Sequence, residues 1–113
     1  MRHLRRNGYR VLYRNFRAPH GGEVDIVCRD KGEKTLVFVE VKTRRTTDFG
    51  EPGTAVNADK QRLIARGALA WLRLLDYPDI RFRFDIAEVV FEAEGPRVNI
   101  IRNAFSLPEP YIY

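Results

Sequence analysis

The sequence predicts an α/β domain in which a mixed central β-sheet of about five strands is flanked by helices. Two patterns predict it: apolar residues alternate with polar ones in several short segments, and one longer segment repeats them at helical spacing. The expected order is a short helix, three strands, a long helix and two strands, with the long helix crossing one face of the sheet. A chain of 113 residues is expected to fold as a single domain over residues 1–113.

The first elements are a short helix and a strand. Residues 1–7 are expected to form the last turn or two of a helix. The helix ends at Gly8, because glycine commonly follows the last residue of a helix. Residues 9–16 alternate in polarity, and this predicts a half-buried strand. One face of that strand is expected to carry Tyr9, Val11 and Tyr13.

The next two strands form the clearest element of the sequence. Residues 23–29 and 35–42 are rich in Val, Ile and Phe, and the turn-like segment 30–34 separates them, which predicts a β-hairpin. A hairpin that closes symmetrically about the middle of that turn places Val27 opposite Phe38.

The second half of the chain predicts a long helix and two strands. Residues 43–56 contain glycine, proline and threonine and are expected to form a loop. Asn57 is a good N-cap for a helix that continues to about Leu75, with apolar residues on one side and arginines on the other. The last two strands are expected at 82–91 and 98–105.

The charge of the chain favours a nucleic-acid partner. Lys and Arg number 20 against 15 Asp and Glu, which gives a net charge of +5, and 16 of the cations are Arg. Arginine makes bidentate contacts with phosphate, so the bias points to DNA or another nucleic acid. A genome rich in G and C would produce the same bias, and one sequence does not separate the two causes.

The sequence lacks the signals of several other protein classes. No apolar run approaches the ~20 residues that span a bilayer, and no apolar stretch follows the basic start, so we expect no membrane association and a cytoplasmic protein. Cys28 is the only cysteine, which excludes an internal disulfide and a thiolate zinc site. The two histidines are too few for a histidine-rich metal centre, and no phosphate-binding glycine loop is present.

Acidic residues on the predicted hairpin form the candidate active site. The expected register places Asp25 opposite Glu40, and Glu23 opposite Lys42. Opposed carboxylates at ~4.5–5.5 Å between their Cβ atoms repel each other unless they share a proton or a cation. Two acids and a lysine suit metal-dependent phosphodiester hydrolysis, with Asp25 and Glu40 holding Mg²⁺ or Mn²⁺. The plain alternative is a solvated charge cluster with a cross-strand ion pair.

Several motifs, taken together, resemble those of the bacterial YraN family. In chain order they are Gly22 to Val27, Phe38 to Arg44, Phe49 with Gly50, Lys60 with Arg62 and Leu63, and Arg83 to Asp85. That family is similar to the PD-(D/E)XK restriction-endonuclease-like superfamily, notably the archaeal Holliday-junction resolvases. The resemblance covers nearly the whole chain and implies a restriction-endonuclease-like fold. It also implies that Asp25, Glu40 and Lys42 match the catalytic motif, with Glu23 as a companion acid.

Two function classes follow from the resemblance, and a third from composition alone. The first is a magnesium- or manganese-dependent endonuclease acting on DNA, structured or branched DNA included. The second is a nuclease-like module that binds nucleic acid without cutting it, because relatives usually carry an acidic helical segment at the start and this sequence has no acid before Glu23. The third is a protein-interaction domain whose basicity reflects genome composition.

Basic and polar residues near the motif are the expected nucleic-acid contacts. They are Arg44, Arg45, Lys60, Gln61, Arg62 and Arg66. The first two directly follow the motif strand, and the others lie on the first turns of the long helix. A solvated helix face explains Arg66 and Arg73 equally well.

The remaining features are interpreted as structural. Asp85 is expected to pair with an arginine rather than to bind metal, and Cys28 is expected to be a small buried apolar residue. The apolar tail from Leu107 to Tyr113 has to be covered, either by its own domain or by a second copy. If a second copy covers the tail, the protein is expected to be a homodimer, because cleavage of both strands of a duplex needs two active sites.

Overall fold

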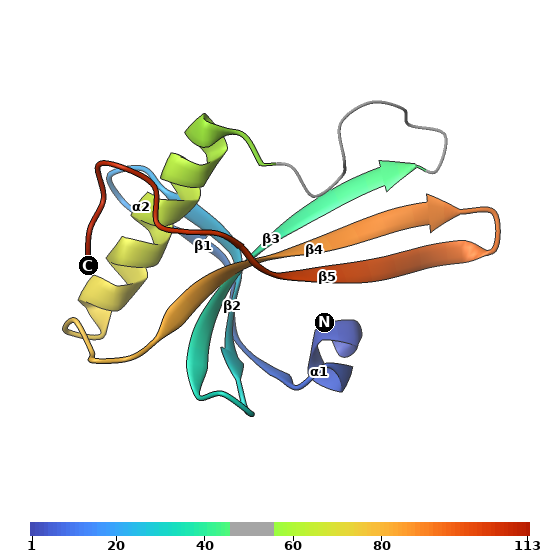
Figure 1. The fold of residues 1–113 in the computed structure, drawn as a ribbon, viewed down its shortest axis with the longest axis horizontal. Helices are drawn as coiled ribbons and strands as arrows, with labels where there is room; N and C mark the ends of the chain where they lie inside the picture. The colour runs from blue at the N-terminus through green and yellow to red at the C-terminus, as the bar shows by residue number, and fades with distance from the viewer. Residues whose placement is uncertain (46–55) are drawn as a thin grey trace.

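The protein consists of one strongly twisted sheet with α2 along one side and α1 against the other (Figure 1). This computed structural model describes residues 1–45 and 56–113. The elements are α1 (Arg2–Arg6), β1 (Tyr9–Arg17), β2 (Glu23–Asp30), β3 (Thr35–Arg45), α2 (Ala58–Leu74), β4 (Phe82–Glu92) and β5 (Gly95–Phe105).

The strands lie side by side in chain order, β1-β2-β3-β4-β5. Neighbouring strands are antiparallel except for β3 and β4, which are parallel because α2 lies between them in the chain and carries it back to the same end of the sheet. The expected α/β fold with a mixed five-stranded sheet flanked by helices is therefore confirmed, and it is consistent with a restriction-endonuclease-like fold.

The hairpin register agrees with the sequence where β2 and β3 are paired. Val27 lies opposite Phe38 as expected, and the ladder runs from the turn as far as Ile26 opposite Val39. It ends there. The two further pairs expected from the sequence, Asp25 with Glu40 and Glu23 with Lys42, are therefore not part of the ladder.

Two apolar clusters lie on the two faces of the sheet. The cluster under α2 includes Phe38, Phe84 and the helix residues Ile64, Ala68 and Leu72. The cluster under α1 contains Leu4, Tyr9, Ile26, Cys28, Val37, Val39 and Ala87. Cys28 is fully buried, as expected, and burial raises the pKa of its thiol to about 12. Burial on both faces explains why β3 reads as a nearly continuous apolar run.

A β-bulge in β1 changes the expected exposure of one aromatic residue. The register with β2 shifts between Val11 and Tyr13, so Tyr13 no longer shares the face of Tyr9 and Val11. Tyr13 instead contacts the ring of Trp71 on α2 at 5.5 Å between centroids, and about half of its surface is exposed. The expectation that Tyr9, Val11 and Tyr13 share one face was therefore wrong for Tyr13.

Strand β3 is longer than the sequence indicated. Residues 43–45 were expected to begin a loop, but they continue the strand because they pair in parallel with Val89, Val90 and Phe91 of β4. Arg44 and Arg45 therefore lie on a strand. The Phe49-Gly50 motif lies outside the described residues.

The C-terminal tail folds back on its own domain. Leu107 packs against the cluster under α2, and the ring of Tyr113 meets that of Phe82 edge to face at 5.4 Å. The Tyr113 hydroxyl donates a hydrogen bond to the carbonyl oxygen of Pro78. Within residues 1–45 and 56–113, no helix is long and apolar enough to cross a membrane.

Candidate active site

Asp25 is held at the point where β2 and β3 stop pairing. Its Oδ2 accepts a hydrogen bond of 2.8 Å from the main-chain N–H of Val41. The side chain thus takes the place of the next main-chain acceptor in the ladder, which brings its carboxylate beside that of Glu40. Two carboxylates on neighbouring strands are therefore adjacent, as the sequence predicted, although the main-chain pairing that was expected to align them is missing.

Glu40 is the most unusual acid of the site. It lies on the α2 side of β3 with only 7% of its surface exposed. Burial raises the pKa of its carboxyl to about 7, and the negative charge of Asp25 adds to this effect while Lys60 opposes it. Its Oε2 atom is buried and accepts no hydrogen bond from any group in residues 1–45 and 56–113. A buried carboxylate oxygen without a partner is costly, so the site has an unmet demand for a cation or a proton.

Lys60, in the first turns of α2, supplies part of that positive charge. Its Nζ lies 2.7 Å from Oε1 of Glu23 and 3.5 Å from Oε1 of Glu40. The Glu23 carboxylate also contacts the guanidinium of Arg17 on β1. Three acids and two cations from β1, β2, β3 and α2 therefore converge. From the sequence, Lys60 was expected only as a phosphate contact, and its pairing with the acids was not expected.

The start of α2 is positioned by two separate features. Asn57 caps the helix as expected, because its side-chain oxygen accepts the N–H of Lys60 at 2.8 Å. About two turns beyond Lys60, Gly67 packs directly on the backbone of Glu23, where a Cβ atom would come within 2.8 Å of main-chain atoms. The helix can approach β2 this closely only because residue 67 has no side chain.

Lys42 lies two residues after Glu40 on β3, so the two side chains are on the same side of the strand. In the parallel register with β4 it is the partner of Glu88. Glu88 is only 3% exposed, and its Oε2 lies 3.4 Å from Nε of Arg44. Glu88 was not among the residues expected at the site, although a signal was available: it continues the series Phe84, Ile86 and Val90 on one face of a buried strand.

The other expected nucleic-acid contacts fall into two groups. Gln61 donates to the carbonyl oxygen of Val56 at 2.9 Å, and Arg62 pairs with Asp59 at 2.5 Å, so both side chains support the start of α2. Arg45 is exposed at the end of β3. Arg66 is exposed on the outer side of α2, where it lines a groove.

A second cluster of charged residues, on the opposite face of the sheet, is structural. Asp85 is fully buried and accepts hydrogen bonds from Arg83 at 3.0 Å and from the Tyr9 hydroxyl at 2.7 Å. Arg83 also binds Asp30 at 2.9 Å. The expectation that Asp85 pairs with an arginine is confirmed, and its oxygens are already occupied.

Comparison with known proteins places the chain in a family. The model of the uncharacterised protein family UPF0102 matches residues 1–89. A UPF0102 protein of Geobacter sulfurreducens is 53% identical over 93% of this chain and 80% of its own length. A UPF0102 protein of Geobacter metallireducens is 47% identical over 93% of this chain and 84% of its own, and one of Caldicellulosiruptor saccharolyticus is 40% identical over 90% and 86%. The resemblance carried by the hairpin motifs is thus confirmed, and the chain belongs to the UPF0102 family, which is the YraN family.

Proposed function

We propose that this protein is a metal-dependent endonuclease that acts on DNA through Asp25, Glu40 and Lys42, with Mg²⁺ or Mn²⁺ as its cofactor. The observation that carries the proposal is the buried, unpartnered Oε2 of Glu40 beside the carboxylate of Asp25. A carboxylate oxygen buried beside a second carboxylate favours a bound cation or a shared proton, and the proposal is that a divalent cation takes this place.

The donor set fits a hard divalent ion. Asp25 and Glu40 would hold it with carboxylate oxygens, which Mg²⁺ prefers. No cluster of three or more His, Cys, Asp or Glu side chains suited to a metal occurs in residues 1–45 and 56–113, so waters and substrate oxygens would complete the shell. Mg²⁺ commonly keeps several waters in this way. When bound, the ion would supply neutralising charge to a phosphate and lower the pKa of a water.

The cations of the chain have separate tasks in this proposal. Lys42, on the same side of β3 as Glu40, holds a proton at Nζ and orients the attacking water or a phosphate oxygen. Lys60 offsets the charge of Glu23 and Glu40, and its ammonium would also be available to a DNA phosphate at the site. Glu23 keeps Lys60 at the site, since their ion pair at 2.7 Å is the shorter of the two.

The net positive charge of the chain supports DNA as the substrate. A chain of net charge +5 attracts a polyanion, and Arg44, Arg45, Arg62 and Arg66 would contact phosphates on either side of the site. Arg44 and Arg45 lie on β3, and Arg62 and Arg66 lie on α2, which is packed against the sheet. We therefore expect structure, including branched DNA, rather than sequence to be recognised.

A second candidate function is binding without cleavage. The position of Lys60 favours it, because an ammonium 3.5 Å from Glu40 already compensates part of the charge that a metal would neutralise. In that case binding depends on salt through Arg and Lys contacts, and it is indifferent to divalent ions.

One experiment separates the two. Duplex, single-stranded and four-way-junction DNA are incubated with the protein and Mg²⁺ or Mn²⁺, and products are resolved on gels. Cleavage that disappears in Glu40→Gln and in Lys42→Gln, but persists in the exposed-turn control Glu94→Gln, supports the nuclease. Cleavage that survives the combined Glu40→Ala and Lys42→Ala change contradicts it, and metal-independent binding without cleavage supports the alternative.

A further inference from the structure

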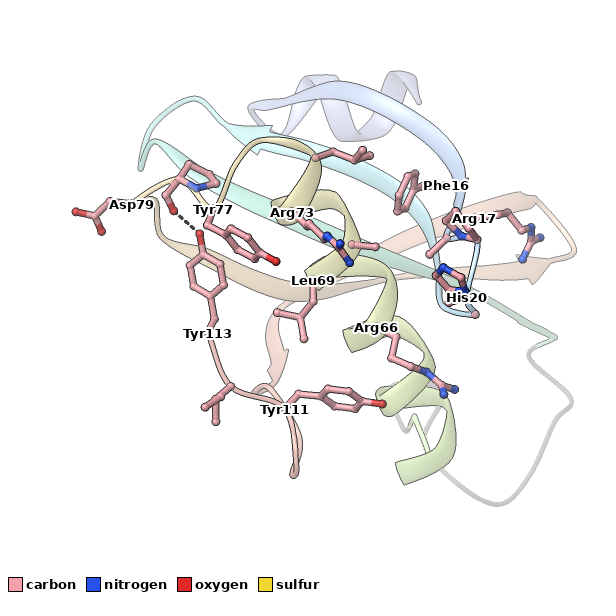
Figure 2. A pocket seen from close by; sticks show the side chains of 17 residues that line it. Phe16, Arg17, His20, Arg66, Leu69, Arg73, Tyr77, Asp79, Tyr111 and Tyr113 are labelled. Carbon is pink, nitrogen blue, oxygen red and sulfur yellow. Dashed lines mark hydrogen bonds between the residues drawn. The ribbon is translucent and has the colours of Figure 1, made fainter.

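A groove of about 1470 Å³ runs along the outer side of α2, away from the sheet. Its walls come from the end of β1 and the β1–β2 loop, from α2, from the α2–β4 connection and from the C-terminal tail. Figure 2 shows the arrangement: Arg66 and Arg73 lie along the helix, Arg17 and His20 lie on one side, and Tyr77, Tyr111 and Tyr113 lie on the other.

The composition of this groove combines cations with aromatic rings. Arg17, Arg66 and Arg73 are all exposed, whereas Asp79 is the single acidic residue among the described residues that line the groove. Tyr77 is 60% exposed and Tyr113 is 50% exposed, which leaves ring surface uncovered in the isolated chain. In proteins that bind unpaired nucleic-acid strands, positively charged groups contact the phosphate backbone and aromatic rings stack against the bases. The groove offers guanidinium groups for the first contact and uncovered tyrosine rings for the second.

We propose that this groove binds a single-stranded segment of nucleic acid and leads it to the candidate active site. The spacing suits this occupant. Arg66 and Arg73 are two helical turns apart, roughly 10 Å along the axis at 1.5 Å per residue. That length corresponds to about three nucleotides at the ~3.4 Å per nucleotide of one strand of stacked DNA, so it fits a stacked strand, and the uncovered tyrosine rings are what favour an unpaired one.

The groove is continuous with the site at one end. Arg17 lines the groove, and its guanidinium contacts the carboxylate of Glu23, which in turn binds Lys60. A strand that follows the arginines from Arg73 to Arg17 therefore arrives beside Glu23 and Glu40. The inference rests on the proposed nuclease function, and it narrows the substrate to DNA with an unpaired end or flap next to the cleaved bond.

The test measures binding without catalysis. A fluorescent oligo-dT of about 15 nucleotides, within the usual site size of such proteins, is titrated with protein in EDTA, and anisotropy is followed at several salt concentrations. We expect Arg66→Gln with Arg73→Gln to weaken binding about tenfold and to reduce the salt slope by roughly 1.4, at about 0.7 per phosphate on a single strand. The matched control is Arg5→Gln with Arg6→Gln, which removes the same charge from exposed residues of α1 on the other face of the sheet.

The tyrosines distinguish an unpaired strand from general attraction to phosphate. Tyr77→Leu with Tyr113→Leu is expected to weaken oligo-dT binding about fivefold or more, since stacking contributes about 1 kcal/mol or more per base. A duplex of the same length should lose less than twofold, because its bases are not free to stack. Thermal unfolding confirms that each variant is folded before its affinity is interpreted.

Three results would overturn the inference. One is an equal loss of affinity in the α1 control; another is an equal loss for duplex and single strand in the tyrosine variant. The third is a second copy of the chain in the groove. Sedimentation equilibrium would then show a dimer of the 13.2 kDa chain, and the Ile112→Asp change would convert that dimer to a monomer. Loss of cleavage with retained oligo-dT binding contradicts only the proposed nuclease, so the two failures are distinguishable.

Discussion

Gly22 and Gly67 bring the turn before β2 and the middle of α2 into backbone contact. A Cβ atom built on Gly22 would lie 2.5 Å from the amide nitrogen of Gly67, and Gly22 itself has a φ of +106°. Side chains normally keep the backbones of two packed elements apart, and here neither glycine has one. The contact matters for the site because Lys60 and Glu23 belong to the two elements that it joins.

Adding one methyl group at this contact is expected to disturb both the fold and the site. Gly67→Ala places its Cβ within 2.9 Å of the backbone of Glu23, so α2 has to move away from β2. We expect a loss of about 1–3 kcal/mol in the free energy of unfolding, as for other overpacked positions. Chemical denaturation measures it.

The control for this change is Gly32→Ala in the β2–β3 turn. There the nearest atom to a new Cβ is Oδ1 of Asp30 at 3.5 Å, an ordinary contact, so little change is expected. If the Gly67 and Gly32 variants are equally stable, the close approach of α2 to β2 is not a constraint on the fold.

The sequence predicted the hairpin well because its register depends on local features. The turn at 30–34 and the alternation of Val, Ile and Phe together determine which residues face each other, and Val27 does lie opposite Phe38. Asp25 and Glu40 are adjacent as expected, but a hydrogen bond from the Val41 N–H to the Asp25 side chain accompanies this adjacency in place of the expected main-chain pair. Periodicity and an N-cap residue were likewise enough to place α2.

What the sequence could not reveal depends on contacts between distant segments. The bulge that turns Tyr13 toward Trp71 has no signal in the alternation of β1. The bridge from Lys60 to Glu23 and Glu40 depends on how α2 crosses β2, which two glycines far apart in the chain decide. Pairing with β4, not any residue preference, extends β3 to Arg45.

The buried ion-pair network around Arg83 is expected to make the stability of the protein depend on pH in the acidic range. Burial by itself would raise the pKa of Asp30, but hydrogen bonds from Arg83 and from the amides of Glu33 and Gly32 outweigh it, so the pKa lies below its ordinary value of 3.8. A carboxyl with a lowered pKa in the folded state stabilises the protein above its ordinary pKa, and this contribution is lost as pH falls through the folded value.

Asp30→Asn tests that dependence. Asparagine keeps an acceptor for the amides of Gly32 and Glu33 but loses the charge that faces Arg83 and Arg102. We expect a loss of about 1–3 kcal/mol at neutral pH, typical of a hydrogen bond to a charged group. The difference from the unmodified protein should shrink as pH falls below 3.8. Asp59→Asn, in an exposed pair with Arg62, should show no such trend.

Removing the charge of Glu40 is expected to stabilise the metal-free protein. In Glu40→Gln the buried carboxylate with its unpartnered Oε2 becomes a neutral amide, and the repulsion from Asp25 disappears. In EDTA at about pH 8, where the carboxyl is ionised, the gain should be about 1–3 kcal/mol, the usual cost of an unsatisfied buried group. Thermal unfolding with Glu94→Gln as control measures it. A Glu40→Gln variant that is less stable than the unmodified protein would show that Lys60 already compensates the charge.

Lys60 is expected to compete with the divalent ion and yet to be needed for cleavage. Its Nζ stands 3.5 Å from Glu40, so an arriving Mn²⁺ has to overcome repulsion from an ammonium next to its ligand. In Lys60→Gln we expect Mn²⁺ to bind roughly tenfold more tightly, a change of about 1.4 kcal/mol. Isothermal titration calorimetry measures the affinity, and a cleavage assay on the same preparation should show a loss of activity.

The control for Lys60 is Arg62→Gln on the same helix. Arg62 pairs with Asp59 rather than with the acids of the site, so Mn²⁺ affinity should stay unchanged. Tighter metal binding together with weaker cleavage assigns Lys60 to the phosphate of the substrate, because a residue that only blocked the metal would be dispensable for activity. Weaker Mn²⁺ binding in Lys60→Gln would instead mean that Lys60 holds Glu23 and Glu40 in the arrangement that the ion requires.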